Sequence, residues 1–462
     1  MSKSCGITSA AFLFSREAEF RVWKRWLQPG FELRLSGTHQ LVRTSAVSTR
    51  IYLLVVLFLG QSLRAENWPF WRGPSRQGVS QETGLPLHWS AESNIVWKAE
   101  IPGEGWSSPI VYGDQVFVTS TTESGVQCRV IAIDRKTGQV QWNKHVFDQT
   151  PLKKEQRNSY ATPTPATDGE RVYAVFGDGS IVAVAARGGE KVWEYRDVNY
   201  YSQHGLGSSP ISYGDLLIMS VDASSSGENK RIGWQIPWDK SYLLALDRKT
   251  GAVRWKGMRG ESRIGHATPN IIKMDRRETL VSGAGDVIQG FSLEDGKRLW
   301  SFYSQGEGVV PSIVVGDGVV FSVSGFEKPH VRAVRPPKEN GGEPELVWEQ
   351  KKSVPMIPSL VFAGKYLYGI TEGGVAICLN AETGEVVWQE RIGGNHFASP
   401  VLVENRIYFL SDEGECTVIE AAPEFKILAR NSLPGSVKAS LAISNRQLFL
   451  RTAQHLYCIS FK

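Results

Sequence analysis

The sequence predicts an all-β protein, an eight-bladed β-propeller built from four-stranded antiparallel blades. Three observations predict this fold. A segment that reads as strand, tight turn, strand and tryptophan recurs at a period of roughly 40–50 residues, which is typical of repeat architectures. Eight leads rich in Ser, Thr and Pro introduce the units. The last unit supplies only three strands, and an isolated strand near the N-terminus supplies the missing fourth.

The repeat is clearest in VIAIDRKTGQVQW, residues Val130–Trp142. Near-copies are Leu244–Trp255 and Ile377–Trp388. Gly138 provides the positive φ that the hairpin turn needs, and Asp134 can accept hydrogen bonds from turn N–H groups. The closing tryptophan is expected to cover the apolar edge where two blades meet.

Eight units are counted from their leads, and seven tryptophans close repeats. The alternative is a seven-bladed ring in which the unit 398–431, which lacks the tryptophan, is an insertion. Its strands look complete, so eight blades are preferred. The units begin near Ser107, Ala161, Ser208, Ala267, Pro311, Pro358, Ala398 and Lys438, and the closing residues are Trp97, Trp142, Trp193, Trp255, Trp300, Trp348 and Trp388.

The alternating segment Asn94–Ile101 has no preceding strands of its own, and the last unit, Lys438–Lys462, has three. We therefore predict that the N-terminal strand closes the ring, which leaves no exposed blade edge. Trp97 should then lie beside the strand around Tyr457. The predicted organisation is a leader at 1–65, an irregular segment over a surface at 66–93, and the propeller at 94–462.

The leader is basic: residues 1–65 hold nine basic and three acidic residues, a net of 9 − 3 = +6, against +5 for the whole chain. The charges of the remaining residues nearly balance, so no nucleic-acid partner is expected.

The apolar run 51–60 of the leader is too short to span a bilayer, which needs about 20 residues. A basic flank and Ala65 are typical of a secretory signal, and a buried core helix is the alternative. We expect export to the periplasm, the envelope or the exterior, and no transmembrane helix in the mature chain.

Two insertions interrupt the period. Residues 222–240 lengthen the middle loop of blade three, and residues 325–345 widen blade five. In an up-and-down blade this middle loop leaves on the same face as the blade-to-blade connections. That face, the channel mouth, is where we expect a ligand.

Three histidines precede the proline of blades three, four and seven, and should face the channel mouth. A shared metal would need convergence to bonding distances of about 2.0–2.1 Å. These blades are spread round the ring, so no metal site is predicted. Either the imidazoles bond to neighbouring backbone, or they line a shallow funnel with aromatic and Arg groups. The two tryptophans of the blade-three insertion either form a contact surface or pack over the mouth. The candidate ligand- or partner-binding residues are Trp106, Tyr160, His204, Trp234, Trp238, Arg263, His266 and His396; no catalytic residue is predicted.

The pattern A-x-D-x-x-T-G-x-x-x-W, complete at Ala132–Trp142 and Ala245–Trp255, resembles the repeat of pyrroloquinoline-quinone-like (PQQ-like) propellers. The resemblance covers essentially Asn94–Phe461 and implies the fold more strongly than an activity, since one fold hosts many functions. Proteins of this kind include quinoprotein alcohol dehydrogenases and the outer-membrane assembly factor BamB, a non-catalytic envelope scaffold.

For the quinoproteins the resemblance implies a quinone held by Ca²⁺, a stacking Trp, an adjacent-Cys disulfide and an Asp base. No two of the five cysteines are adjacent, and neither an Asp base nor the oxygen ligands of Ca²⁺ can be assigned by motif. We therefore predict a monomeric, non-catalytic binding or scaffold module without a cofactor. Its partner would be an envelope protein, or a small ligand or glycan, at the channel mouth. The alternative is a dehydrogenase of alcohols or sugars that uses PQQ and Ca²⁺.

Overall fold

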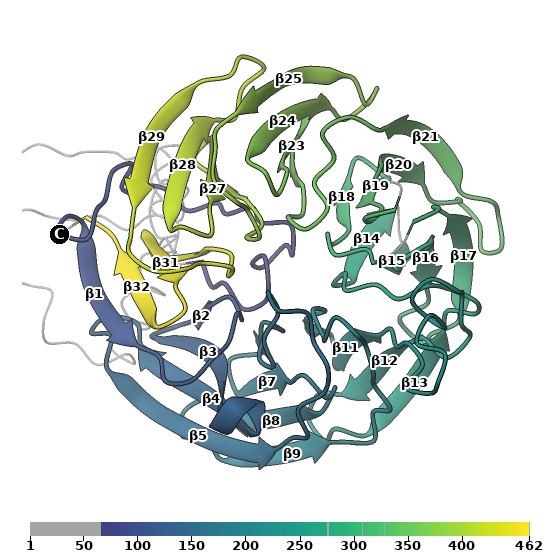
Figure 1. Cartoon of the computed structure of the whole chain (residues 1–462), viewed down its shortest axis with the longest axis horizontal. Helices are drawn as coiled ribbons and strands as arrows, with labels where there is room; N and C mark the ends of the chain where they lie inside the picture. Colours follow the sequence, from purple (N-terminus) through teal and green to yellow (C-terminus); the bar gives the residue numbers. More distant parts are fainter. Residues whose placement is uncertain (1–65, 275–276, 307, 328, 462) are drawn as a thin grey trace, which may run out of the picture. The chain divides into compact units, whose positions relative to one another are not determined.

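The computed structural model describes residues 66–461 except 275–276, 307 and 328. The predicted leader at 1–65, its apolar run 51–60 and Cys5 lie outside the described residues. The described residues form eight four-stranded antiparallel sheets arranged in a ring (Figure 1), which confirms the predicted propeller. No helix within residues 66–461 combines the length and the apolar character needed to cross a bilayer.

Each blade runs from an innermost to an outermost strand. Blade 1 contains β2 (Ile110–Tyr112), β3 (Gln115–Thr122), the 3-10 turn η1 (Glu123–Gly125), β4 (Gln127–Asp134) and β5 (Val140–Asp148); blade 2 contains β6 (Ala166–Thr167), β7 (Arg171–Val175), β8 (Ile181–Ala185) and β9 (Lys191–Tyr195); blade 3 contains β10 (Ile211–Tyr213), β11 (Leu216–Val221), β12 (Tyr242–Asp247) and β13 (Val253–Met258). Blade 4 contains β14 (Asn270–Met274), β15 (Arg277–Gly283), β16 (Val287–Phe291) and β17 (Arg298–Tyr303); blade 5 contains β18 (Val314–Gly316), β19 (Val319–Val323), β20 (Val331–Arg335) and β21 (Glu345–Gln350); blade 6 contains β22 (Val361–Ala363), β23 (Tyr366–Ile370), β24 (Val375–Asn380) and β25 (Val386–Arg391). Blade 7 contains β26 (Val401–Val403), β27 (Arg406–Leu410), β28 (Glu415–Glu420) and β29 (Ile427–Ser432); blade 8 contains β30 (Ala442–Ser444), β31 (Gln447–Arg451), β32 (His455–Ile459) and β1 (Ile95–Glu100).

The N-terminal strand closes the ring as predicted. β1 pairs antiparallel with β32, with Trp97 opposite Cys458 and Lys98 opposite Tyr457. The seven-bladed alternative is wrong, because β26 to β29 form a complete sheet of their own. The stretch 325–345 is not one continuous insertion, because it contains the strand β20.

The closing tryptophans seal the blade interfaces. The indole N–H of Trp97 donates to the carbonyl of Arg135 in the next blade (2.8 Å), and the indole of Trp142 donates to Ala186 in the same way (3.1 Å). Five of these rings, those of Trp97, Trp142, Trp193, Trp255 and Trp348, also lie against a glycine of the turn in the next blade: a Cβ added to Gly138 would sit 2.7 Å from the ring of Trp97. The Gly and Trp of the pattern T-G-x-x-x-W therefore have two roles: the Gly forms the turn of its own blade, and both residues make contacts with neighbouring blades. The other indoles with such a bond belong to Trp193, Trp255, Trp348 and Trp388.

The position opposite each closing tryptophan holds a small residue. Ala132 lies opposite Trp142, and Cys378 lies opposite Trp388. Cys378 is a buried free thiol, and it fills this position as a small hydrophobic residue. The predicted role of the turn aspartate is also confirmed, because Asp134 accepts from the N–H groups of Lys136 and Thr137.

The segment 66–90, hereafter the plug, runs across the ring and contacts every blade. Two backbone hydrogen bonds join the plug to β2. The Trp68 N–H donates to the Val111 carbonyl, and the Val111 N–H donates to the Trp68 carbonyl. Trp68 is fully buried, so the plug forms part of the core rather than a cover over a surface. Its partners in the remaining blades are Thr167, Tyr213, Asn270, Val315, Leu360, Leu402 and Ser444.

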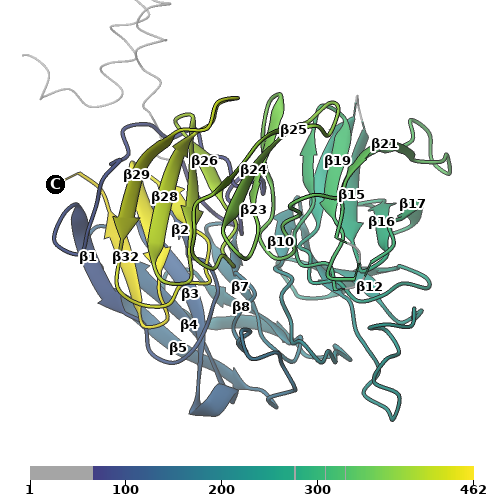
Figure 2. The ribbon, with the colours of Figure 1, turned by 45° about the horizontal axis from the view of Figure 1, so that its top comes forward.

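The plug enters the channel from the side of the hairpins that join the first and second strand of each blade. The opposite face carries the blade-to-blade connections and the long loop 222–241 between β11 and β12. Figure 2 shows this loop and the tip of the β3–β4 hairpin projecting on the same side of the disc. The channel is therefore a funnel that is open at the face of the blade-to-blade connections and closed by the plug at the opposite face.

Candidate functional site

A closed ring of hydrogen bonds surrounds the channel. In each blade a Ser or Thr just before the innermost strand accepts a bond, at 2.8–3.0 Å, from the backbone N–H of its counterpart in the preceding blade. The last bond, from Ser440 to Ser108, joins the last blade to the first. This hydroxyl ring consists of Ser108, Thr164, Ser209, Thr268, Ser312, Ser359, Ser399 and Ser440.

The hydroxyl ring explains the Ser/Thr/Pro leads of the sequence. A backbone N–H buried beside the channel needs an acceptor, and a hydroxyl in the next blade provides one. Each hydroxyl also has a proton to donate. Among the described residues, none of the eight hydroxyls donates a hydrogen bond to protein. The ring therefore offers several free donors to whatever occupies the channel.

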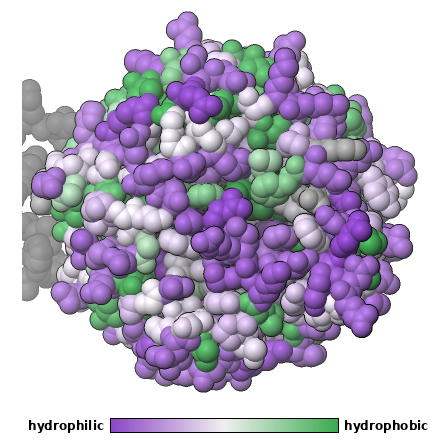
Figure 3. Space-filling model, viewed as in Figure 1, coloured by the Kyte–Doolittle hydropathy of each residue, from purple (hydrophilic) through white to green (hydrophobic). Residues whose placement is uncertain are grey.

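Above the ring lies a cavity of about 450 Å³, which we call the mouth cavity. Seven of the eight ring residues line it, all except Ser359. Trp71 of the plug also lines the cavity, and Trp106, Trp234, Phe326 and Phe397 add aromatic surface. Seen from this face the protein is mostly polar, and a few apolar residues lie among polar ones near the centre (Figure 3).

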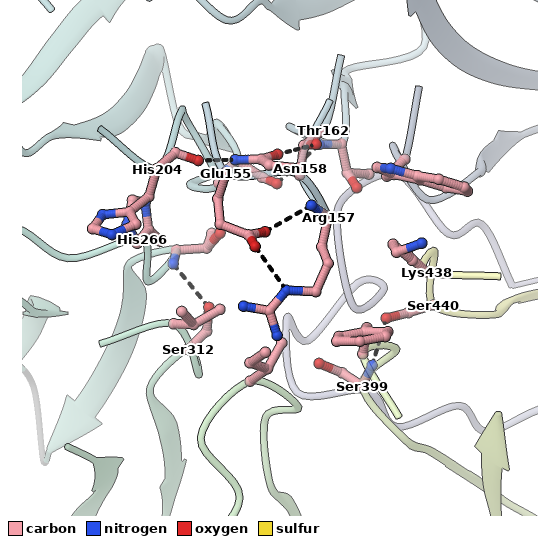
Figure 4. A pocket seen from close by; sticks show the side chains of 18 of the residues that line it. Glu155, Arg157, Asn158, Thr162, His204, His266, Ser312, Ser399, Lys438 and Ser440 are labelled. Atoms are coloured by element: carbon pink, nitrogen blue, oxygen red, sulfur yellow. Dashed lines mark hydrogen bonds and ion pairs between the residues drawn. The ribbon is translucent and has the colours of Figure 1, made fainter. Parts of the chain in front are cut away.

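One wall comes from the long connection between β5 and β6. Glu155 and Arg157 form an ion pair there at 3.0 Å. Asn158 donates to the carbonyl of His204 in the next connection, which fixes the two loops together. Arg157 also lies over the ring of Phe397 at 5.8 Å. In Figure 4 the carboxylate of Glu155 points toward Arg157 inside the cavity.

The facing wall comes from the connections that lead into blades 1 and 8. The ammonium of Lys438 lies 4.3 Å from the centre of the Trp106 ring, a cation–π contact. The same ammonium lies 3.4 Å from the carboxylate of Asp412. Lys438 and Ser440 are on the opposite side of the cavity from His204 and His266 in Figure 4.

His204 and His266 lie together in this cavity, with ring centres 6.1 Å apart. They come from blades three and four, which are neighbours, so the expectation that the histidines are spread round the ring is wrong for this pair. Trp234 meets the His204 ring edge-on at 5.4 Å. The Nδ1 atom of His204 is buried and has no partner among the described residues.

Burial keeps both imidazoles neutral near pH 7. It lowers the pKa of His204, and it lowers that of His266 to about 3, with a smaller contribution from the neighbouring His204. A neutral imidazole has one donor and one acceptor nitrogen. The pair therefore presents hydrogen-bonding groups of both kinds without adding charge.

His396 is not part of the cavity. It is buried, with its ring nitrogens 3.1 Å from the carbonyl of Leu410 and 2.9 Å from that of Gly393. For this histidine the backbone-bonding interpretation agrees with the geometry, and the expected position at the channel mouth does not.

Three further predicted residues lie outside the mouth cavity. The Tyr160 hydroxyl donates to the carbonyl of Leu152, so it shapes its own connection. Arg263 pairs with Glu327 at 2.7 Å. Trp238 is half-buried against the interface of blades two and three rather than exposed. Of the eight predicted residues, the cavity brings together Trp106, His204, Trp234 and His266.

The mouth cavity does not fit a quinone held by Ca²⁺. Ca²⁺ takes six to eight oxygen ligands, with carboxylates prominent among them. The described lining holds one carboxylate, Glu155, and Arg157 already pairs with it. No group of three or more His, Cys, Asp and Glu side chains suited to a metal occurs among the described residues.

The fold and cavity define a class: an eight-bladed PQQ-like propeller with a blind funnel at its centre. The sequence profile of the outer membrane protein assembly factor BamB matches residues 76–226, 236–336 and 327–424, more than half of the chain. The chain therefore belongs to the BamB family. It is 22% identical over 267 residues to BamB of Bordetella pertussis (strain Tohama I), covering 54% of this chain and 59% of that relative.

Solved structures share the fold. BamB from Moraxella catarrhalis superposes with a TM-score of 0.55 at 16% identity, covering 80% of this chain and 97% of that one. A europium-containing methanol dehydrogenase gives a TM-score of 0.63 at 12% identity, covering 86% and 98%. At such identities the similarity concerns the fold alone, because folds host many functions.

Proposed function

We propose that this protein is an exported, non-catalytic binding and scaffold module of the bacterial envelope that takes part in the assembly of outer-membrane proteins. The observation that carries the proposal is the match of the BamB family profile to more than half of the chain. The lining of the mouth cavity supports a binding role, because aromatic and hydrogen-bonding groups predominate over charged ones.

Deletion of the gene in the source bacterium tests this function. We expect the outer-membrane fraction to lose several of its proteins, measured by quantitative mass spectrometry, and expression of the wild-type chain to restore them. Cross-linking in intact cells should join the chain to an envelope protein. An outer-membrane composition that is unchanged after deletion contradicts the proposal.

The second candidate is a quinoprotein dehydrogenase, favoured by the similarity to the methanol dehydrogenase fold. It predicts saturable quenching of tryptophan fluorescence by PQQ with Ca²⁺, and reduction of an artificial dye with an alcohol or sugar. We expect neither, because the donor set of the cavity lacks the carboxylates that Ca²⁺ requires. Micromolar saturation together with dye reduction would replace the scaffold proposal.

A further inference from the structure

The charges around the mouth cavity cancel locally. Arg157 is paired with Glu155 at 3.0 Å, and Lys438 with Asp412 at 3.4 Å. His204 and His266 are neutral near pH 7, since burial lowers the pKa of each. A multiply charged organic acid would find no unpaired cation in the described lining. The electrostatics therefore favour an uncharged ligand.

The remaining polar groups favour a ligand that both donates and accepts hydrogen bonds. Seven residues of the hydroxyl ring line the cavity, and their hydroxyls donate to no protein group among the described residues. A hydroxyl oxygen can also accept a second bond. The Nδ1 of His204 is buried without a partner, and His266 is 8% exposed, with no bond from its ring to protein among the described residues. A polar atom in such a position is costly unless a ligand or water satisfies it.

The aromatic groups favour a ligand with flat apolar faces. Trp71 lines the cavity from the plug, while Trp106 and Trp234 line it from the connections and loops above. Aromatic rings provide large, rigid surfaces for stacking. A sugar ring combines apolar C–H faces with a rim of hydroxyl groups. The volume of about 450 Å³ lies in the usual range for small-ligand pockets.

We propose that the mouth cavity binds an uncharged carbohydrate, a mono- or disaccharide unit stacked on indole and bonded to the hydroxyl ring and the histidine pair. This inference rests on the proposed binding function of the channel mouth and names the ligand class. The loop 222–241 supplies one stacking surface through Trp234, whereas Trp238, four residues along, lies outside the cavity.

The test is calorimetric titration of the full chain with glucose, maltose, cellobiose and chitobiose, and with glucuronate as the charged counterpart of glucose. We expect at least one uncharged sugar to bind saturably below about 10 mM and to change the tryptophan fluorescence. Trp234→Ala should weaken that binding about tenfold or more, and Trp238→Ala, the control from the same loop, should leave it unchanged.

A second pair of variants examines the hydroxyl ring. Thr164→Val keeps the shape but removes the hydroxyl and should weaken sugar binding, whereas Thr164→Ser keeps the hydroxyl and should retain it. Thermal unfolding checks that all variants remain folded. The proposal is overturned if none of the four sugars binds, if Trp234→Ala and Trp238→Ala weaken binding equally, or if glucuronate binds more tightly than glucose. Loss of the carbohydrate inference would leave the outer-membrane phenotype intact, so the two failures are distinguishable.

Discussion

Gly138 meets two demands of the repeat at one position. Its φ of +74° is one that glycine adopts readily. Its missing Cβ also leaves room for Trp97 of the adjoining blade. The same pairing recurs at Gly251 against Trp193 and Gly384 against Trp348. The sequence alone indicated the turn, because turn residues have local signatures. The contact between blades became visible only when the ring was assembled.

Alanine substitutions of Gly113 and Gly138 should distinguish the cost of the positive φ from the cost of the contact with the tryptophan. Gly113 also has a positive φ, +58°, but nothing lies within 4 Å of an added Cβ. We expect Gly113→Ala to cost about 1–2 kcal/mol from backbone strain. Gly138→Ala should cost about 1–3 kcal/mol more, because it forces the tryptophan to move. Urea unfolding midpoints measure both; equal losses would show that the indole contact is unimportant.

His266 should make stability depend on pH. Its folded pKa of about 3 lies below the ordinary value of 6.5, so the unfolded chain takes up the proton first. The associated stability is fully present above about pH 6.5 and is lost as the pH falls toward 3, with a slope of at most about 1.4 kcal/mol per pH unit. His266→Gln should flatten this part of the curve in urea unfolding between pH 7 and pH 4.5. Parallel curves for the two proteins would contradict the prediction.

The histidine pair also shows what limits prediction of the site. Both histidines were candidates from their place before a blade proline, yet their convergence depends on the lateral packing of blades three and four. Glu155 and Arg157 were not among the predicted site residues, because they lie in the connection 149–165, outside the repeated strand and turn pattern. The clearest available signal for the site was the repeated Ser/Thr lead, which became the hydroxyl ring.

At the scale of elements, the plug has the contacts of a core segment although it has no regular secondary structure. Trp68 is fully buried against blade 1 and the neighbouring core, whereas Trp71 is half-buried and faces the mouth cavity. Its Pro- and Gly-rich sequence correctly indicated irregular backbone. That composition did not reveal burial, because the surface that covers the plug comes from eight different repeats.

Alanine replacements within the plug should therefore have unequal effects. Trp68→Ala removes a fully buried ring and should cost about 3–5 kcal/mol of unfolding free energy. Trp71→Ala, three residues away, should cost much less, because its ring borders open space. Denaturant unfolding of the two variants provides the comparison. A small effect of Trp68→Ala would mean that the plug contributes little to the fold.

The loop 222–241 is anchored at its first residue by a buried ion pair. Arg259 bonds to Asp222 through Nε (2.5 Å) and Nη2 (3.1 Å), and both side chains are almost fully buried. Asp222→Ala leaves the guanidinium unpaired and should cost about 3–5 kcal/mol. The double variant Asp222→Ala with Arg259→Met should recover part of that loss. Additive losses in a double-mutant cycle would show that the pair does not act as a unit.

At the scale of the whole molecule, the same contacts join every pair of neighbouring blades, including blades 8 and 1, between which the chain has its two ends. The hydroxyl ring joins blade 8 to blade 1 through Ser440 and Ser108, just as it joins every other neighbouring pair. β1 completes blade 8 through pairing with β32. The count of eight could be predicted because each blade repeats a local pattern and the end of the chain is one strand short.

This continuity predicts that the position of the chain ends is unimportant for stability, provided that the closing segment is present. The Ser460 N–H donates to the carbonyl of Asn94, and Glu66 lies beside Ser444 in blade 8. A permuted chain that begins at residue 102 and carries 66–101 behind residue 461 on a short flexible linker should keep all of these contacts. We expect its thermal midpoint to stay within a few degrees of that of the parent, with one cooperative transition.

The same permuted chain without 66–101 exposes the edge of β32 and the open channel, and should aggregate or unfold without cooperativity. Equal stability of the two chains would show that neither the closing strand nor the plug holds the ring together.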